Sequence, residues 1–428
     1  MDLILITPIG RSGSLLVQSL LDSHTELISL PTMLLRYPNW ELSKYKTKDF
    51  ILEFIDKHPN IFDLSNRDNY LGKLNKVHKL LSEGVDPEKY QVSINKFLEN
   101  AEVIFDKEWD KFISRKNFFE GIHLTYAKTI GMDITKIKYM VIHLHSIIDV
   151  ETGHKNALKD YPNLKFIATS RDPREHWISH EKLKKKNFKE KRLSSYNFFR
   201  KLELYKMIYK FKKSVDNLKL ITSKLNVKQT MIVDLNFLHS NGKVLMKQIC
   251  KWLNIDFEVC LFESTFLGLP WYGNAASGKS MNGFDFNKSK FLWPSNLGIK
   301  DKKIIETFLK NEIISLKYEK NFQFNDNLKY IFYPFEYNFL FLLSNAIREF
   351  KLNFKQNHKN KINQKFISSN FSYKKFLYPL IVTFIFTKKL TYESYLLLRS
   401  KLYYLKSKFN NEIEKKNINA YFLKEFKN

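Results

Sequence analysis

The first 21 residues restrict the possible fold more than any other part of the sequence. A continuous apolar run, Leu3 to Ile6, ends at Thr7-Pro8 and predicts a buried strand. A turn that contains Gly10 and Gly13 follows, and residues 15–21 then have apolar side chains at helical spacing. A strand, a glycine-containing turn and a helix in this order are typical of an α/β protein.

The same alternation of strands and helices continues along the chain. Apolar runs predict further strands at 139–144, 164–169 and 230–233, and helical patterns occupy 182–224 and the region around 244–253. We therefore expect an α/β fold with a central, mainly parallel sheet flanked by helices. Residues 1–330 are predicted to form one domain with a mostly helical insertion at 35–130, followed by a basic, aromatic-rich helical extension at 331–428.

Composition excludes several classes of protein. With 44% hydrophobic residues in 428, the chain can bury a sizeable core, which excludes wholesale disorder. Its two cysteines, Cys250 and Cys260, are too few for a disulfide framework or a four-thiolate zinc site. No apolar run reaches the roughly 18 residues of a membrane-spanning helix, and residue 1 is not followed by a signal-peptide pattern. We expect a cytoplasmic protein.

The positive charge has two interpretations. The net charge is +27, yet lysine is spread along most of the chain, and no zinc-finger, helix-turn-helix or RNP-like pattern accompanies it, so we expect no nucleic-acid partner. Residues 331–428 hold 18 Lys or Arg and 6 Asp or Glu. These basic stretches are either solvated helix faces or, around the apolar segment 376–382, a surface that contacts anionic lipid at the inner face of the membrane.

The turn after the first strand has the composition of a phosphate site. Unpaired backbone N–H groups and the positive dipole end of a helix N-terminus attract anions. Gly10 and Gly13 permit close approach of the backbone, Arg11 adds a fixed charge, and Ser12 and Ser14 add hydroxyls. The segment matches neither the Walker A pattern nor Gly-x-Gly-x-x-Gly. An ordinary strand-to-helix turn is the alternative.

A second polar group follows the strand predicted at 164–169. Arg171 comes at its end, Asp172-Pro173 is a typical helix start, and Ser179 lies one to two helical turns further on. An arginine and a serine in this arrangement can converge on one phosphate. Taken alone, the pattern also fits a simple helix N-terminus.

Together the two elements resemble the PAPS-dependent sulfotransferase family, which has a P-loop-like fold. Residues 7–14 are similar to its 5′-phosphosulfate loop, and Ser170-Arg171-Asp172-Pro173 with Ser179 is similar to its 3′-phosphate motif. Residues 265–283 occupy the place of its third, basic motif. Two positions depart from the pattern: Arg11 stands where many relatives carry lysine, and Leu15 where many carry a second hydroxyl.

The resemblance implies PAPS as the cofactor and assigns roles to individual residues. Arg11 and the backbone from Ser12 through Gly13 and Ser14 to Leu15 would hold the 5′-phosphate. The 3′-phosphate would be held by Arg171 and Ser179, joined by Ser277 and Lys279 of the third motif. Arg11 would also act in catalysis by stabilising the charge on the leaving phosphate.

Two histidines are the candidates for the general base that takes the acceptor proton. In a strand, His143 and His145 point to the same face, and His145 is preferred because it lies nearer the carboxyl end, where α/β active sites form. Packing histidines are the alternative, and His123, Glu120 and Asp133 are weaker candidates. A metal interpretation is rejected because no third ligand accompanies the pair.

The predicted function is the transfer of a sulfuryl group from PAPS to a hydroxyl or amine of a carbohydrate, glycolipid or small metabolite, with no metal. Positioning and charge neutralisation would supply most of the catalysis. An ATP-dependent P-loop phosphotransferase and a non-catalytic nucleotide- or glycan-binding module of the same fold are the alternatives.

Overall fold

The computed structural model describes residues 1–31, 37–63, 89, 91–144, 150–190, 196–271, 283–319 and 421–422. The chain divides into two compact units that are interleaved in sequence. The first comprises Met1–Arg171, Ser214–Phe291 and Ile418–Asn428, and the second Asp172–Lys213 and Leu292–Asn417. Of the extension predicted at 331–428, only Tyr421 and Phe422 are among the described residues, so that domain division stays a prediction.

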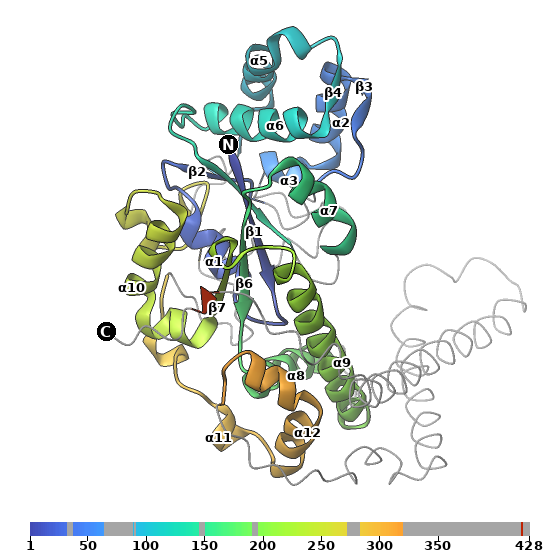
Figure 1. Cartoon of the computed structure of the whole chain (residues 1–428), viewed down its shortest axis with the longest axis vertical. Coiled ribbons are helices and arrows are strands. Elements are labelled where there is room, and N and C mark those ends of the chain that lie inside the picture. The colour runs from blue at the N-terminus through green and yellow to red at the C-terminus, as the bar shows by residue number, and fades with distance from the viewer. Residues whose placement is uncertain are drawn as a thin grey trace, which may run out of the picture. The chain divides into compact units, whose positions relative to one another are not determined.

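The first unit is built on a six-stranded sheet in which every neighbouring pair of strands is parallel. The strand order is β10-β7-β6-β1-β5-β2 (Figure 1). Its strands are β1 (Asp2–Pro8), β2 (Leu27–Ser29), β5 (Tyr139–His143), β6 (Lys165–Ser170), β7 (Thr230–Asp234) and β10 (Tyr421–Phe422). The predicted α/β fold and all four predicted strands are thus confirmed.

The central position of β1 explains its continuous apolar sequence. Because β1 is paired with β5 on one side and β6 on the other and is covered on both faces, Leu3, Ile4, Leu5 and Ile6 are all buried. The side chains of Ile4 and Ile6 join a core cluster with residues of helices α1 (Ser14–Leu21) and α10 (Leu235–Leu253). These two helices lie on one side of the sheet and α7 (Val150–Asp160) on the other (Figure 1).

The other elements of the first unit are mostly helical. The described residues between 37 and 130 form four α-helices and a small antiparallel sheet of β3 (Leu42–Lys46) and β4 (Phe112–Ser114). These helices are α2 (Thr47–Lys57), α3 (Pro59–Phe62), α5 (Ile94–Phe105) and α6 (Arg115–Thr129). A hairpin of β8 (Thr265–Phe266) and β9 (Leu269–Pro270) and a 3-10 helix, η6 (Phe286–Lys288), follow α10.

Buried ion pairs hold the second unit together. It contains α8 (Pro173–Glu190), α11 (Trp293–Asn296) and α12 (Ile299–Ser315), and α9 (Tyr196–Thr222) passes from this unit into the first. Arg174 on α8 is 1% exposed and bonds to Asp172 and to Glu306 of α12. Lys212 of α9 likewise lies 3.1 Å from Glu312 of α12. Helices α8 and α9 confirm the helices predicted within 182–224. The ion pairs join each of them to α12.

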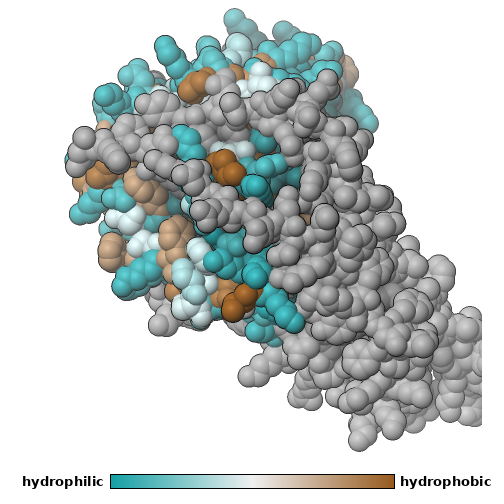
Figure 2. Space-filling view, turned by 60° about the horizontal axis from the view of Figure 1, so that its bottom comes forward, coloured by the Kyte–Doolittle hydropathy of each residue, from teal (hydrophilic) through white to brown (hydrophobic). Residues whose placement is uncertain are grey.

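In the described part of the chain, no helix is long and apolar enough to cross a membrane, and no group of three or more His, Cys, Asp or Glu residues is placed to hold a metal ion. Figure 2 shows a face on which hydrophilic side chains of the described residues are interspersed with small, separate hydrophobic areas.

Candidate functional site

The loop between β1 and α1 requires glycine for two separate reasons. Gly13, the residue before α1, has φ +77°, a left-handed conformation that side chains with a Cβ disfavour. A Cβ built on it would also lie 2.4 Å from Leu235 Cδ1 at the start of α10. No side chain of the described residues caps α1, so the amides of its first turn are presented at the carboxyl edge of the sheet for a ligand.

The two serine hydroxyls of this loop bond to the neighbouring strands. Ser12 Oγ lies 2.8 Å from Thr169 Oγ1 on β6, and Ser14 Oγ lies 2.7 Å from His143 Nε2 on β5. Ser12 is 1% exposed. These contacts fix the shape of the loop from both sides, so contact with a phosphate falls mainly to the backbone amides and to Arg11.

His143 lies behind the loop. It is the last residue of β5, pairs in register with Ile6 of β1 and is 2% exposed. Its hydrogen bond to Ser14 places the ring at the N-terminus of α1. His145, the preferred base, lies outside the described residues.

The two arginines predicted to bind phosphate are brought together. Arg11 follows the end of β1, and Arg171 follows the end of β6, the strand beside it. Burial and the nearby Arg171 guanidinium lower the pKa of Arg11. Two positive charges therefore lie close enough to repel each other near the carboxyl edge of the sheet, an arrangement that a bound anion would stabilise.

A third cation, Lys288 in η6, joins this pair and was missed by the sequence analysis. Burial and the Arg171 charge lower the pKa of Lys288, while Asp285, 3.7 Å away, opposes the shift. Asn236 of α10 donates hydrogen bonds to the carbonyl oxygens of Lys288 and Ser289 at 3.4 and 3.0 Å, which anchors the segment beside β7.

A buried histidine supports the same segment in its neutral form. His239 of α10 accepts a hydrogen bond from the Asp285 backbone N–H at 3.2 Å. Burial, followed by the charge of Lys288, lowers the pKa of His239 to about 4. At neutral pH, His239 therefore adds a hydrogen bond to the site without adding positive charge.

The sequence offered no local signal for Lys288. It is one of 71 Lys and Arg residues, and its position beside Arg171 depends on contacts between α10 and η6. The third motif instead predicts Lys279, nine residues earlier. Ser277 and Lys279 lie outside the described residues. The β8–β9 hairpin that precedes them is anchored by Asp22, which accepts hydrogen bonds from Thr265 and Gly268 at 2.9 and 3.0 Å.

The remaining predicted residues are placed as follows. Leu15 lies in the first turn of α1, as expected for a backbone contact. Ser179 lies on α8 in the second unit, whereas Arg171 ends a segment of the first, so their shared role stays a prediction. His123, the weaker base candidate, is fully buried on α6, and its Nδ1 lies 2.7 Å from the Phe119 carbonyl oxygen. The surroundings of His123 are those of a residue that packs in the interior.

The site of the first unit thus combines an uncapped helix N-terminus with three cationic side chains, Arg11, Arg171 and Lys288. The site lies where the strand order reverses. After β1 the chain forms β2 and β5 on one side of β1, and then β6 and β7 on the other. Ligands of open α/β sheets bind at such a point, outside the carboxyl ends of the strands. The arrangement suits an anion with more than one negatively charged group.

Comparison with known proteins gave two solved structures of interest. No family model matches the chain, and no curated protein matches it. The chain is similar to the sulfotransferase domain from the curacin biosynthetic pathway, with 16% identity and a TM-score of 0.39 over 72% of this chain and 97% of that one. It is also similar to the sulfotransferase domain from the Synechococcus PCC 7002 olefin synthase, with 14% identity and a TM-score of 0.35 over 72% and 94%.

Proposed function

We propose that this chain is a PAPS-dependent sulfotransferase that transfers a sulfuryl group to a hydroxyl or amine of a carbohydrate, glycolipid or small metabolite. The observation that carries the proposal is the approach of Arg11 and Arg171 at the uncapped N-terminus of α1. The cofactor has a 5′-phosphosulfate and a separate 3′-phosphate, which together match more than one cationic group.

The residues of the loop fit the cofactor. The left-handed conformation of Gly13 leads the chain into α1 without a capping side chain, and the amides at the start of α1 are donors suited to the 5′-phosphate. Arg11 adds a charge there, while Arg171 and Lys288 supply charge for the 3′-phosphate. When bound, PAPS supplies an activated sulfuryl group. The chain holds the leaving phosphate and offsets the charge that develops on it.

We assign His143 a positioning role. A general base must come within hydrogen-bond reach of the acceptor, and the buried His143 ring bonds to Ser14 at 2.7 Å. It holds the loop in the shape that presents the helix amides. His145 stays the proposed base. His143→Gln should therefore weaken nucleotide binding, whereas His145→Gln should lower kcat and leave nucleotide binding intact.

Nucleotide selectivity tests the proposal against its alternatives. We would titrate the full chain by calorimetry with adenosine 3′,5′-bisphosphate, AMP and ADP. A 3′-phosphate bound by charged groups should favour the bisphosphate over AMP by roughly tenfold to a hundredfold. Arg171→Met should reduce that preference by about fivefold or more, leaving the part that Lys288 supplies, while the affinity for AMP changes little.

Each alternative predicts a different result. A preference for ADP over the bisphosphate would support the ATP-dependent phosphotransferase and overturn the proposal. Selective binding of the bisphosphate without turnover of any hydroxyl-bearing acceptor would favour the non-catalytic module. Full retention of the preference in Arg171→Met would contradict the assignment of Arg171.

A further inference from the structure

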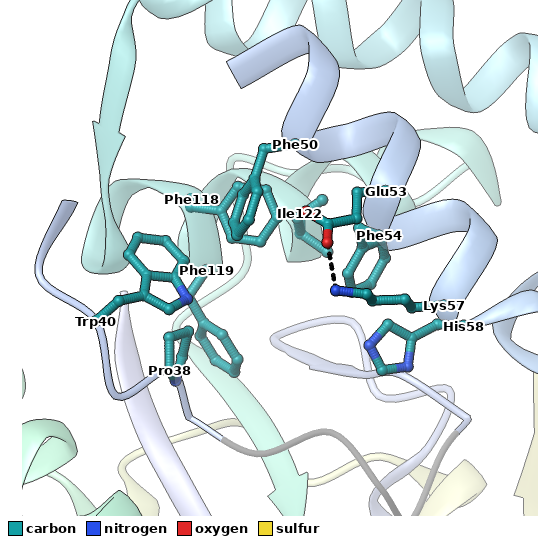
Figure 3. Close-up of a pocket in the computed structure, with 10 residues that line it drawn as sticks. All are labelled: Pro38, Trp40, Phe50, Glu53, Phe54, Lys57, His58, Phe118, Phe119 and Ile122. Carbon is teal, nitrogen blue, oxygen red and sulfur yellow. Dashed lines mark hydrogen bonds and ion pairs between the residues drawn. The ribbon is translucent and has the colours of Figure 1, made fainter. Parts of the chain in front are cut away.

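A cavity of about 180 Å³ lies in the first unit between α2, α6 and the segment 37–40 (Figure 3). None of the functional residues considered above lines it. Its apolar wall is formed by six side chains: Trp40, Phe50, Phe54, Phe118, Phe119 and Ile122. The pocket is open to solvent on one side, and a concave, mostly apolar hollow with a few polar groups at one end is typical of a site for a small ligand.

The aromatic rings that form the wall support one another. Phe118 has its ring centroid 4.7 Å from that of Phe50, 5.8 Å from Trp40 and 6.1 Å from Phe54. The Trp40 and Phe50 rings meet edge to face at 5.0 Å. Such contacts stabilise each ring in place, so the cavity is largely formed before any ligand arrives.

Buried polar contacts fix the segment that contributes Trp40. Arg115 of α6 donates a hydrogen bond to the Trp40 carbonyl oxygen at 3.2 Å and two more to Asp160 of α7. Asp160 also accepts from the Tyr37 hydroxyl at 2.6 Å. The segment 37–40 is thus tied to both helices, and the pocket wall is rigid on this side.

The polar groups of the pocket come from a single stretch of α2 and its C-terminus. Glu53 and Lys57 form an ion pair one turn apart, and His58 lies beside them, across the cavity from Pro38 and Trp40 (Figure 3). Burial, followed by the charge of Lys57, lowers the pKa of His58, which favours the neutral ring. The carboxylate and the ammonium balance, so this end offers a hydrogen-bond acceptor and a donor without net charge.

Size and charge together define the ligand. An apolar cavity of about 150 Å³ is known to bind a benzene-sized molecule, so this cavity accommodates one six-membered ring with a small substituent. A permanent anion would compete with Glu53 for Lys57, and a permanent cation would lie close to Lys57. A hydroxyl can accept from Lys57 and donate to Glu53.

We propose that this pocket is a binding site for a small uncharged phenol, with the ring against the Trp40, Phe50 and Phe118 side chains and the hydroxyl on the Glu53–Lys57 pair. The inference goes beyond the proposed sulfuryl transfer and holds or fails independently of it. Phenol itself is the probe, since its ring and hydroxyl are the two features that the pocket recognises.

Calorimetric titration of the full chain with four probes separates ligand classes. Phenol should bind more tightly than toluene, which has the ring without the hydroxyl, and more tightly than benzoate or phenyltrimethylammonium, which add a negative or a positive charge. Tighter binding of either charged probe, or no saturable binding of phenol, would overturn the proposal.

Two substitutions test whether phenol binds at this pocket. Lys57→Met should weaken phenol binding about fivefold, the value of one net hydrogen bond, and leave toluene unaffected. Lys136→Met is the matched control, because Lys136 has a similar side-chain exposure (64% against 62%) and also faces an acidic partner on the surface. Equal phenol affinity in wild type and Lys57→Met would contradict the role of the ion pair.

A filling substitution tests the cavity itself. Ile122→Trp should occupy the space and abolish binding of both phenol and toluene, as long as circular dichroism shows an unchanged helix content. If that variant does not fold, Phe50→Ala replaces it, since Phe50 is only half-buried and its removal opens one wall. Unaltered phenol binding in a folded variant of either kind would place the ligand elsewhere and overturn the proposal.

Discussion

Two arginines only three positions apart have opposite surroundings. Arg174, in the second unit, is bonded to the carboxylates of Asp172, Glu306 and Glu319. Burial alone would lower its pKa, but these hydrogen bonds and charges, from Asp172 first, raise it. Arg171, in the first unit, instead lies close enough to Arg11 and Lys288 to lower the pKa of both.

The difference separates a charge that is surrounded by carboxylates from a charge that lies beside other cations. A buried guanidinium surrounded by carboxylates is neutralised by the protein, and its removal leaves those carboxylates uncompensated. Cations gathered at a sheet edge repel one another, which costs stability unless an anion is bound. Sequence proximity therefore does not imply a shared role.

The largest expected effect is that of Arg174→Met on stability. Because the substitution leaves Asp172 and Glu306 buried without their partner, the free energy of unfolding should fall by about 3–5 kcal/mol in urea denaturation. Arg171→Met should lower it by about 1 kcal/mol or less, since that substitution relieves repulsion with Arg11. Equal losses in the two variants would contradict the comparison.

The contrast also shows what could be predicted from the sequence. Strands of a parallel sheet are continuous apolar runs, so β1, β5, β6 and β7 were predictable, whereas the three-residue edge strand β2 was too short to recognise. Arg11 and Arg171 were found because each lies in the turn after such a strand. Lys288 was not, since no local pattern distinguishes it, and the aromatic pocket was not, since distant segments combine to form it.

The next largest effect concerns pH at the sheet edge. The pKa of His239 in the folded protein is about 4, below its ordinary value of 6.5, so the unfolded chain binds the proton more readily. This histidine therefore contributes stability above pH 6.5 that is lost as the pH falls towards 4. As the pH falls from 6.5 to 4, the free energy of unfolding should therefore decline by roughly 3 kcal/mol less in His239→Asn than in wild type.

Urea denaturation at a series of pH values measures this difference. The asparagine Oδ1 can replace Nδ1 as the acceptor for the Asp285 N–H, so the hydrogen bond is retained. Above pH 7 the difference between variant and wild type should be constant, which serves as the internal control. A parallel decline of both proteins from pH 6.5 to 4 would show that His239 does not titrate as described.

A smaller effect separates backbone strain from ligand binding. Gly13→Ala places a Cβ at φ +77° and against Leu235, and should cost about 1–2 kcal/mol of stability as well as nucleotide affinity. Gly131→Ala is the matched control, because Gly131 has φ +88° but open space where its Cβ would lie. Its stability should fall by a similar amount while binding of adenosine 3′,5′-bisphosphate is unchanged. Loss of binding in both variants would indicate general destabilisation.

The smallest effect concerns the third cation of the cluster. Lys288→Met should weaken binding of adenosine 3′,5′-bisphosphate by about fivefold to tenfold, as expected for one charged contact of roughly 1 kcal/mol. It should also reduce the salt dependence of binding, because one fewer exposed charge remains to be screened. Lys290→Met, two residues further along and exposed, should alter neither quantity. If both variants bind as wild type does at low and at high salt, the cluster consists of Arg11 and Arg171 alone, and the contrast with Arg174 then depends on that pair.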